Sequence, residues 1–482
     1  MFSIGNQPNP WIRPIWEALF EGLSQLTQAA DDFWRGVQIT TPGLVLRFER
    51  LIHKLASRLI SDVLVGHGIQ LALESEALEV AANQLVQQRE HSRLQKAETE
   101  VRVRMLGGTQ QTFVVPYYLI RAPRGPGRPS DKRGPNGNGY YPKLELLGIH
   151  DRVTPAVASN VASQVARSPV EEATAILQDG GLELNSKTVT RISRRLASRA
   201  LEFAGELIGR MRSGRKGTAC RGLRIAIAID GGRVRTRNPY GRRRRSTGRR
   251  RFKGEWREPK VFVIYELDEN GRRKKKGLCI YGGTMGQADE CFELLAAYLC
   301  YVGAHLAEEV VILGDGAEWI WNRVDDLVKK VAINRSKVTE VVDFYHVVER
   351  LHEIAKTQLA WTDRERQLWV TARVAQLKAG HVQAMMRAAD EINAELGNYF
   401  HNNRARLDYK GCRNRHLPIG SGAVESGIRR IINLRLKGNG NFWDIKNAEG
   451  IIHLRCQLVA GRWTKLIESV ILPREHWGQC AA

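Results

Sequence analysis

The chain contains 482 residues, of which 43% are hydrophobic and 7% are aromatic. This composition excludes wholesale disorder, and the length exceeds what one ordinary core can serve, so we expect roughly two to four domains. The 74 Lys and Arg residues outnumber the 51 Asp and Glu residues and give a formal net charge of +23. Because Lys and Arg release counterions from phosphates, nucleic acid is the leading partner, ahead of a ribosome-like structural role or an anionic membrane surface.

The cysteine pattern and the hydropathy bear on the cellular compartment. The seven cysteines are scattered, without a CxxC pair or zinc-like spacing, which favours reduced thiols in a cytosolic protein. The N-terminal stretch lacks the basic segment and the apolar run of a signal peptide. No stretch reaches the length of about 18 uncharged apolar residues that a membrane span requires, so no membrane partner is expected. We therefore expect a cytoplasmic protein.

Residues 1–120 are expected to form a mainly helical N-terminal domain with a short hairpin. The pattern is typical of helix over residues 11–100, where leucines at four-residue spacing, such as Leu51 and Leu55, lie on one helix face. Residues 101–120 then alternate around a Gly-Gly pair, which predicts the hairpin.

Residues 121–142 are rich in Gly, Pro, Arg and Lys and are expected to form a flexible basic linker at a domain boundary. The PRGPGRP core of this linker is similar to the AT-hook, a segment that lies in an A·T minor groove. Pro126 and Gly127 interrupt the usual Arg-Gly-Arg core. A basic linker is therefore the first interpretation, and minor-groove contact is the second.

Residues 143–215 are expected to contain a helix-turn-helix that binds DNA. The Ser-Pro pair at Ser168 is typical of a helix start, the Gly-Gly pair at Gly180 is typical of its end, and Ser186 is expected to cap a second helix. An ordinary helical hairpin with a solvated basic face is the alternative. The candidate DNA-binding side chains on the second helix are Arg191, Arg194 and Arg195.

Residues 220–346 change to a pattern of strands. Three strands, a helix, a fourth strand, a helix and a fifth strand are expected, which is the order of the ribonuclease H-like fold. Residues 347–415 are helical in pattern and too long for an ordinary loop, so they are expected to be a helical insertion, after which residues 416–470 complete the core. The expected strands are residues 224–230, 261–267, 278–284, 310–314 and 339–346.

The predicted fold class is therefore an α/β ribonuclease H-like catalytic core with a helical insertion. Mainly helical N-terminal and helix-turn-helix DNA-binding domains are expected to precede this core.

Three carboxylates occupy positions that favour metal binding on this plan. Asp230 ends the first expected strand, Asp315 ends the fourth, and Glu425 lies on a helix after the insertion. The first and fourth strands are neighbours in the ribonuclease H-like order, so Asp230 and Asp315 would be adjacent at a sheet edge, where ligands bind. Taken singly, each carboxylate is more often a turn residue or a helix cap. Together they predict a site for Mg²⁺, the natural counterion for converging carboxylates.

Four motifs resemble those of the DDE transposases of bacterial insertion sequences, on the branch related to Mutator-type elements. The set is specific, whereas any one motif alone is weak. The resemblance covers roughly the C-terminal half of the chain and, more weakly, the helix-turn-helix region. The motifs are IAIDGGRVR (227–235), ILGDGAEWIW (312–321), DFYH (343–346) and GSGAVESGIRR (420–430).

The resemblance implies an activity and a set of partners. Asp230, Asp315 and Glu425 would bind two Mg²⁺ ions, for which Mn²⁺ can substitute, and would catalyse cleavage at transposon ends and joining of the 3′-OH to target DNA. Asp343 and His346 would be auxiliary: His346 would orient a phosphate or Asp343, with a packed strand-end histidine as the alternative. The expected partners are double-stranded DNA, as terminal repeats and as target, and further copies of the chain, at least as a dimer. The expected location is the bacterial cytoplasm, in association with the nucleoid.

The basic segment at residues 233–260 lies next to Asp230. A disordered loop is one interpretation, and a clamp on the DNA backbone, with Arg243, Arg244 and Arg250 as contacts, is the favoured one. Trp443 is a candidate for stacking on an unpaired base, although core packing is the commoner role of a tryptophan.

Two other functions remain open at this point. A ribonuclease H-like structure-specific nuclease would cleave DNA without strand transfer. A catalytically inactive, transposase-derived DNA-binding regulator would bind DNA without either reaction, although the presence of all three carboxylates disfavours it.

Overall fold

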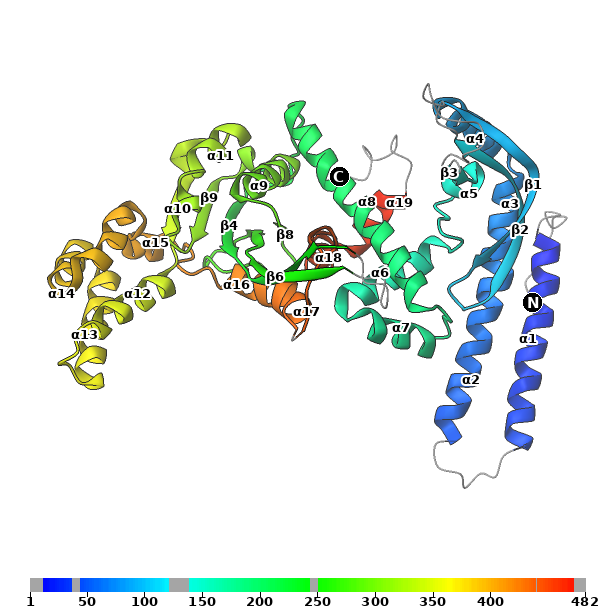
Figure 1. Cartoon of the computed structure of the whole chain (residues 1–482), viewed down its shortest axis with the longest axis horizontal. Coiled ribbons are helices and arrows are strands. Elements are labelled where there is room, and N and C mark those ends of the chain that lie inside the picture. Colours follow the sequence, from blue (N-terminus) through cyan, green and yellow to red (C-terminus); the bar gives the residue numbers. More distant parts are fainter. Residues whose placement is uncertain (1–11, 37–43, 121–137, 243–249, 439, 472–482) are drawn as a thin grey trace. The chain divides into compact units, whose positions relative to one another are not determined.

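The computed structural model, shown in Figure 1, describes residues 12–36, 44–120, 138–242, 250–438 and 440–471. The chain divides into two compact units. The first comprises Met1–Leu196 and Ile467–Ala481, and the second is Ala197–Leu466. The linker predicted at residues 121–142 lies largely outside the described residues.

The N-terminal part of the first unit consists of four helices, a single π-helical turn and a small sheet. The elements are α1 (Ile12–Arg35), α2 (Leu44–Leu59), the π-helical turn Ile60–Val65, α3 (Gly66–Glu74), α4 (Glu76–Gln88), β1 (Ser92–Arg104), β2 (Gln110–Ile120) and β3 (Asn138–Tyr140). The strands pair antiparallel in the order β1-β2-β3. The predicted hairpin is therefore confirmed.

The hairpin is longer than predicted, because β1 begins at Ser92 and not near residue 101. The prediction of helix over residues 92–100 is wrong. The apolar side chains Val101 and Val103 alternate into a core that contains Phe113 and Val115 of β2. The preceding residues are mostly exposed, so their side chains carry no strand signal, and pairing with β2 fixes their conformation.

Three further helices follow in the first unit, and the last of them continues past Leu196 into the second. They are α6 (Pro155–Arg167), α7 (Val170–Asp179) and α8 (Ser186–Arg212), preceded by the short α5 (Pro142–Leu146). The two helices joined by a glycine turn are thus present. The predicted cap is displaced by one residue, because Asn185 Oδ1 accepts the Thr188 N–H at 2.9 Å and Ser186 already belongs to the helix.

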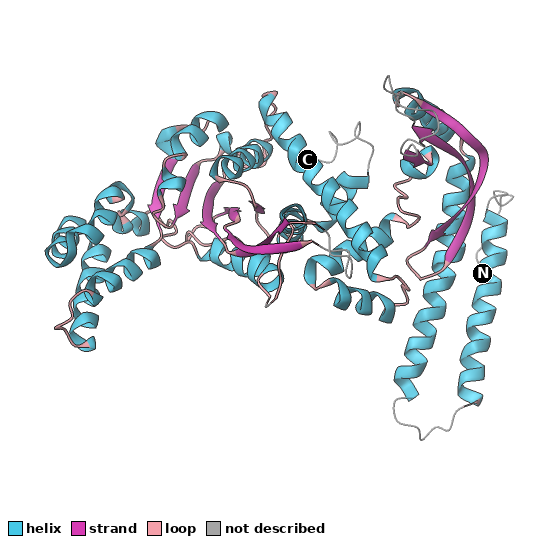
Figure 2. Cartoon of the chain, in the orientation of Figure 1, coloured by secondary structure: helices cyan, strands magenta, loops and turns pink. Residues whose placement is uncertain are grey.

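A five-stranded mixed sheet forms the centre of the second unit (Figure 2). Its order is β10-β9-β4-β7-β8. The central strand β4 is parallel to β9 and antiparallel to β7, while β10 is parallel to β9 and β8 is antiparallel to β7. The strands are β4 (Arg224–Gly231), β7 (Lys260–Glu266), β8 (Cys279–Thr284), β9 (Glu309–Gly314) and β10 (Val338–Val342).

Helices cover this sheet and extend from it. α9 (Ala288–Val302) packs on β7 and β8, α18 (Ile445–Val459) packs on β8, and α16 (Gly422–Ile428) packs on β4 and β7. The segment predicted to be helical contains α12 (Phe344–Lys356), α13 (Asp363–Ala379), α14 (Val382–Asn402) and α15 (Tyr409–Asn414). The remaining elements of the second unit are α10 (Glu318–Trp321), α11 (Val324–Val331), α17 (Leu434–Leu436) and several single helical turns. The helix α19 (Trp463–Ile471) begins in the second unit, and its residues from Ile467 onward belong to the first.

The fifth strand is shorter than predicted. It ends at Val342, and the following Asp343 caps α12, so the DFYH motif belongs to a helix start and not to a strand. The carboxylate of Asp343 accepts the N–H groups of Tyr345 and His346, and this cap ends the strand.

Candidate active site

The three predicted carboxylates come from three separate segments of the second unit. Asp230 lies near the end of β4, and Asp315 directly follows β9. β4 and β9 are neighbouring parallel strands, with Ala228 of β4 opposite Leu313 of β9, so both side chains lie at the same edge of the sheet. Glu425 lies on α16, which packs on β4 and β7. The predicted adjacency of the first and fourth strands is therefore present.

The pKa of Asp230 depends on its burial and on the charged groups near it. The pKa of this carboxyl is raised from 3.8 to about 6, mainly by burial and to a smaller extent by the neighbouring Asp315 and Glu425 carboxylates. The Gly231 N–H, which donates to Asp230 Oδ1 at 2.6 Å, and the nearby His346 oppose this shift. Asp230 is thus a partly buried acid whose ionised form lacks enough positive charge around it.

The Asp315 turn is fixed by its own backbone and by a tyrosine. Asp315 Oδ1 accepts the Ala317 N–H at 3.1 Å. Gly316 adopts a φ of 66°, and a Cβ atom there would lie 2.4 Å from the Tyr399 ring. Glycine is therefore required at this position for both its conformation and its lack of a side chain. Burial, together with the Asp315 carboxylate, raises the pKa of the Tyr399 hydroxyl, so this ring stays neutral.

Asp343 connects the segment that carries Asp315 with the segment that carries Glu425. Its side chain is fully buried, and besides capping α12 its Oδ2 accepts the Ser421 N–H. The Asp343 N–H donates to the Gly314 carbonyl at 2.8 Å, one residue before Asp315. The Ser421 carbonyl accepts the Glu425 N–H at 3.2 Å. Asp343 therefore acts as a positioning residue for Asp315 and Glu425.

His346 lies in the first turn of α12. Its ring is 3.0 Å from Glu349 through Nδ1, and its backbone N–H, not its ring, contacts Asp343. Burial lowers the pKa of the imidazole, but the Asp343, Glu349 and Asp315 carboxylates together outweigh burial and raise it. The strand-end alternative is wrong, because His346 lies on a helix with a partly exposed ring.

We call the sheet edge that carries Asp230 and Asp315, together with the nearby Glu425, the carboxylate edge. Its donor chemistry fits a hard divalent cation. Asp230, Asp315 and Glu425 supply carboxylate oxygens, which Mg²⁺ prefers, and a cation would favour the ionised form of Asp230, whose pKa is raised first by burial and then by the neighbouring carboxylates. Within the described ranges, no group of three or more His, Cys, Asp or Glu side chains is already arranged to hold a metal ion. Carboxylates repel one another when no cation lies between them, so Asp230, Asp315 and Glu425 are expected to lie farther apart without a cation than with one.

The basic segment beside Asp230 is a β-hairpin where the structure describes it. β5 (Val234–Tyr240) pairs antiparallel with β6 (Arg251–Arg257). Arg243 and Arg244 lie outside the described residues, and Arg250 is exposed directly before β6. The interpretation as a disordered loop is therefore wrong for the two strands.

An arginine and an aromatic side chain stack on the face of this hairpin. The Arg235 guanidinium lies 4.8 Å from the centre of the Trp256 ring and 5.9 Å from that of Phe442. Trp256 nevertheless remains 54% exposed. The sequence carries a signal for this position of Trp256, because Phe252, Gly254 and Trp256 occur at every second residue and therefore lie on one face of a strand.

Trp443 anchors the hairpin. Its backbone N–H donates to the Arg235 carbonyl, and its carbonyl accepts the Arg237 N–H, both at 2.9 Å. Its indole N–H donates to the Leu436 carbonyl at 3.0 Å, and Arg435 lies over the ring. These contacts give Trp443 a packing role, and stacking on a base stays a prediction.

The predicted DNA-binding arginines of α8 lie in the first unit. Arg191 and Arg195 both pair with Asp151, at 3.4 and 3.1 Å, while remaining 60% and 47% exposed. Arg194 is exposed as well. Asp151 is only 14% exposed, whereas the three arginine side chains are exposed, and DNA contact by them stays a prediction.

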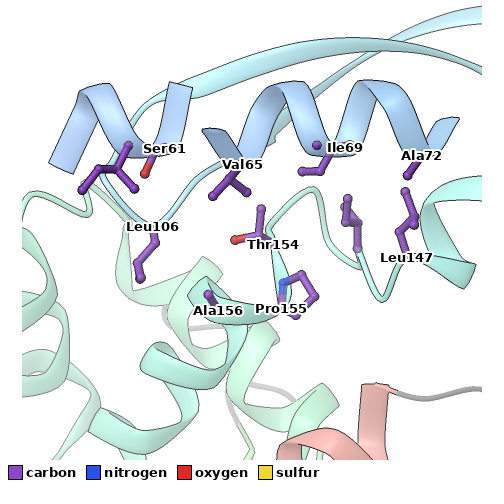
Figure 3. A pocket seen from close by; sticks show the side chains of 12 residues that line it. Ser61, Val65, Ile69, Ala72, Leu106, Leu147, Thr154, Pro155 and Ala156 are labelled. Atoms are coloured by element: carbon purple, nitrogen blue, oxygen red, sulfur yellow. The ribbon is translucent and has the colours of Figure 1, made fainter. Parts of the chain in front are cut away.

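A cavity of about 440 Å³ in the first unit is chemically different from the carboxylate edge (Figure 3). Its lining includes Val65, Ile69, Leu106 and Leu147 and carries no titratable side chain. It therefore offers no group for acid, base or metal chemistry.

Comparison of the chain with protein families, with curated proteins and with solved structures found no match. No helix in the described part of the chain is long and apolar enough to span a membrane.

Proposed function

We propose that this chain is a DDE transposase that cleaves transposon ends and joins the freed 3′-OH to target DNA by two-metal-ion phosphoryl transfer. The observation that carries the proposal is that Asp230 and Asp315 lie at the ends of neighbouring parallel strands, with Glu425 on the helix α16 that packs on β4. Both Asp315 and Glu425 are near enough to act on the pKa of Asp230, which burial is the first to raise. The likeness of their four motifs to those of the Mutator-related transposases supports the same function.

The sheet supports a ribonuclease H-like core for this proposal. Read from the other end, its order is β8-β7-β4-β9-β10. The strands β4, β7 and β8, which come first in the chain, form an antiparallel meander, and β9 and β10 are parallel to β4. This is the arrangement expected of that fold. The helices between β10 and α16 then correspond to the helical insertion.

The residues of the chain divide the work of such a reaction. Asp230, Asp315 and Glu425 would hold two Mg²⁺ ions, which supply a nucleophile at neutral pH and stabilise the leaving oxygen. Asp343 keeps the Asp315 and Glu425 segments in place through its contacts with the backbone. His346, whose pKa is raised, would contribute positive charge toward a phosphate. The arginines of β5, β6 and α8 would bind the DNA backbone.

A strand-transfer assay tests the proposal. The protein, Mg²⁺, labelled DNA from both flanks of its own gene and a target plasmid would be combined, and Asp315→Asn would be compared with Asp326→Asn. Asp326 is an exposed acid on α11 and serves as a matched control. We expect cleaved ends and joined products with the wild type and the control, and neither with Asp315→Asn.

The other outcomes assign the site to a different function. Cleavage without joining would identify a structure-specific nuclease. Binding of the flanking DNA with neither reaction, in Mg²⁺ and in Mn²⁺, would identify a catalytically inactive DNA-binding regulator.

A further inference from the structure

The two N-terminal helices of the first unit pack side by side as a helical hairpin (Figure 1). Gly22 of α1 lies against Leu59 of α2, and a Cβ atom at Gly22 would be 2.0 Å from the leucine Cδ1. Near the other end, Phe33 and Trp34 contact the Phe48 ring, with centroid distances of 5.2 and 4.9 Å. One face of α1 is therefore used within the chain.

A second apolar face of α1 is exposed. The large side chains Trp16, Phe20 and Leu23 are between 50% and 68% exposed. Together with Thr27 and Ala30 they follow one another at alternating steps of four and three residues along the helix. This is the heptad spacing of helices that pack against a partner helix. Exposed apolar surfaces of this extent mark interaction sites.

The opposite charges of the two helices indicate what covers this face. α1 carries four acids against two arginines, a net charge of −2, in a chain whose total charge is +23. α2 carries four basic residues against one glutamate, a net charge of +3. Two of the acids of α1, Glu17 and Asp31, directly follow residues of the exposed heptad face. Pairing α1 with another α1 would place these acids together, whereas pairing it with α2 would place them opposite basic residues.

We infer that this hairpin is an interface with a second copy of the chain, in which α1 of each copy packs on α2 of the other about a two-fold axis. The apolar residues Val45 and Leu46 of α2 are also exposed and extend the apolar contact. DNA and anionic lipid are poor occupants of this face, because each would meet the acidic α1. The inference goes beyond the proposed catalytic function and does not rest on it.

The oligomeric state of the full chain without DNA tests the apolar part of the interface. Light scattering during size exclusion would compare the wild type with the double variant Phe20→Glu/Leu23→Glu at physiological ionic strength. We expect a dimer for the wild type and a monomer for the variant, whose dimer dissociation constant should rise roughly 30-fold or more. Leu359→Glu, at an 89% exposed apolar position of the second unit, is the matched control and should remain dimeric.

Mixing two charge-reversed proteins tests the pairing of α1 with α2. Glu17→Lys/Glu21→Lys makes α1 basic, and Arg50→Glu/Lys54→Glu makes α2 acidic, so each variant alone should be monomeric. In an equimolar mixture, basic α1 meets acidic α2 and acidic α1 meets basic α2, so heterodimers should form. Repair of a contact within one chain could not produce this result, because each charge reversal is on a different molecule.

Three results would overturn the inference. The first is a wild type that is monomeric at every concentration, and the second is a Phe20→Glu/Leu23→Glu variant that is dimeric. The third is a mixture of the charge-reversed variants that remains monomeric although circular dichroism shows both to be folded. A monomeric wild type that sediments with anionic vesicles through Phe20 and Leu23 would assign the face to a lipid surface instead.

Discussion

The carboxylate edge and the β5–β6 hairpin, which directly follows Asp230 in the sequence, differ in burial and in charge. Asp230 is partly buried among other acids, and the fully buried Asp343 fixes the segments around it. The hairpin instead carries its arginines on exposed strands, where Arg235 stacks on the exposed Trp256. A buried site can tolerate little displacement, whereas an exposed one can adapt to a flexible ligand. Changes at the edge should therefore affect chemistry, and changes at the hairpin should affect binding.

The largest effect is expected at Asp315. Replacing it with asparagine keeps the side-chain shape but removes a charge that a metal pair requires, so the rate of end cleavage should fall by about 10³-fold or more. DNA affinity, measured by fluorescence anisotropy, should change by less than about twofold, because the proposed function assigns the phosphate contacts to the arginines of β5, β6 and α8. A parallel loss of affinity in Asp315→Asn would erase the contrast between the edge and the hairpin.

Removing the Asp343 side chain should affect stability as well as chemistry. Asp343→Ala removes the cap of α12 and leaves the Ser421 N–H without its buried acceptor. The free energy of unfolding should fall by about 2–4 kcal/mol in urea titrations. Asp363→Ala is a matched control, since Asp363 is an exposed acid in the first turn of α13.

A positioning role for Asp343 predicts more than lost stability. At a temperature where Asp343→Ala is fully folded, its cleavage rate should still fall and the increase in melting temperature on adding Mg²⁺ should shrink. A variant with normal Mg²⁺ stabilisation and normal rate would reduce Asp343 to a helix cap.

The strand-end acids Asp230 and Asp315 could be predicted from the sequence because their signal is local. Asp230 and Asp315 each follow an unbroken apolar run, and such runs become buried strands whose ends meet at one edge. The role of Asp343 depends on Ser421, 78 residues away, and no local pattern encodes that contact. The β5–β6 hairpin is not predicted for a different reason. Its many arginines obscure the alternation of buried and exposed side chains along the strands.

An intermediate effect is expected from pH in the absence of metal. The pKa of Asp230 rises from 3.8 to about 6 on folding, so the folded chain binds this proton more tightly than the unfolded chain does. Stability should therefore fall as pH rises from about 4 to about 6, by on the order of 2 kcal/mol. Unfolding titrations across this range should show a smaller fall in Asp230→Asn. Mg²⁺ should reduce the fall in the wild type, and equal slopes in both proteins would mean that folding does not raise the pKa of Asp230.

The smallest effect is expected at Trp256, on the binding side of the contrast. Trp256→Ala removes an exposed ring and releases Arg235 from its stacked position, so affinity for DNA with unpaired ends should fall by about fivefold, or roughly 1 kcal/mol. Trp369→Ala is a matched control, because Trp369 also stacks with an arginine, Arg373, but lies on α13. At saturating DNA the cleavage rate of Trp256→Ala should equal that of the wild type. A lower rate with unchanged affinity would mean that the hairpin shapes the carboxylate edge, and the two regions would then act as a single site.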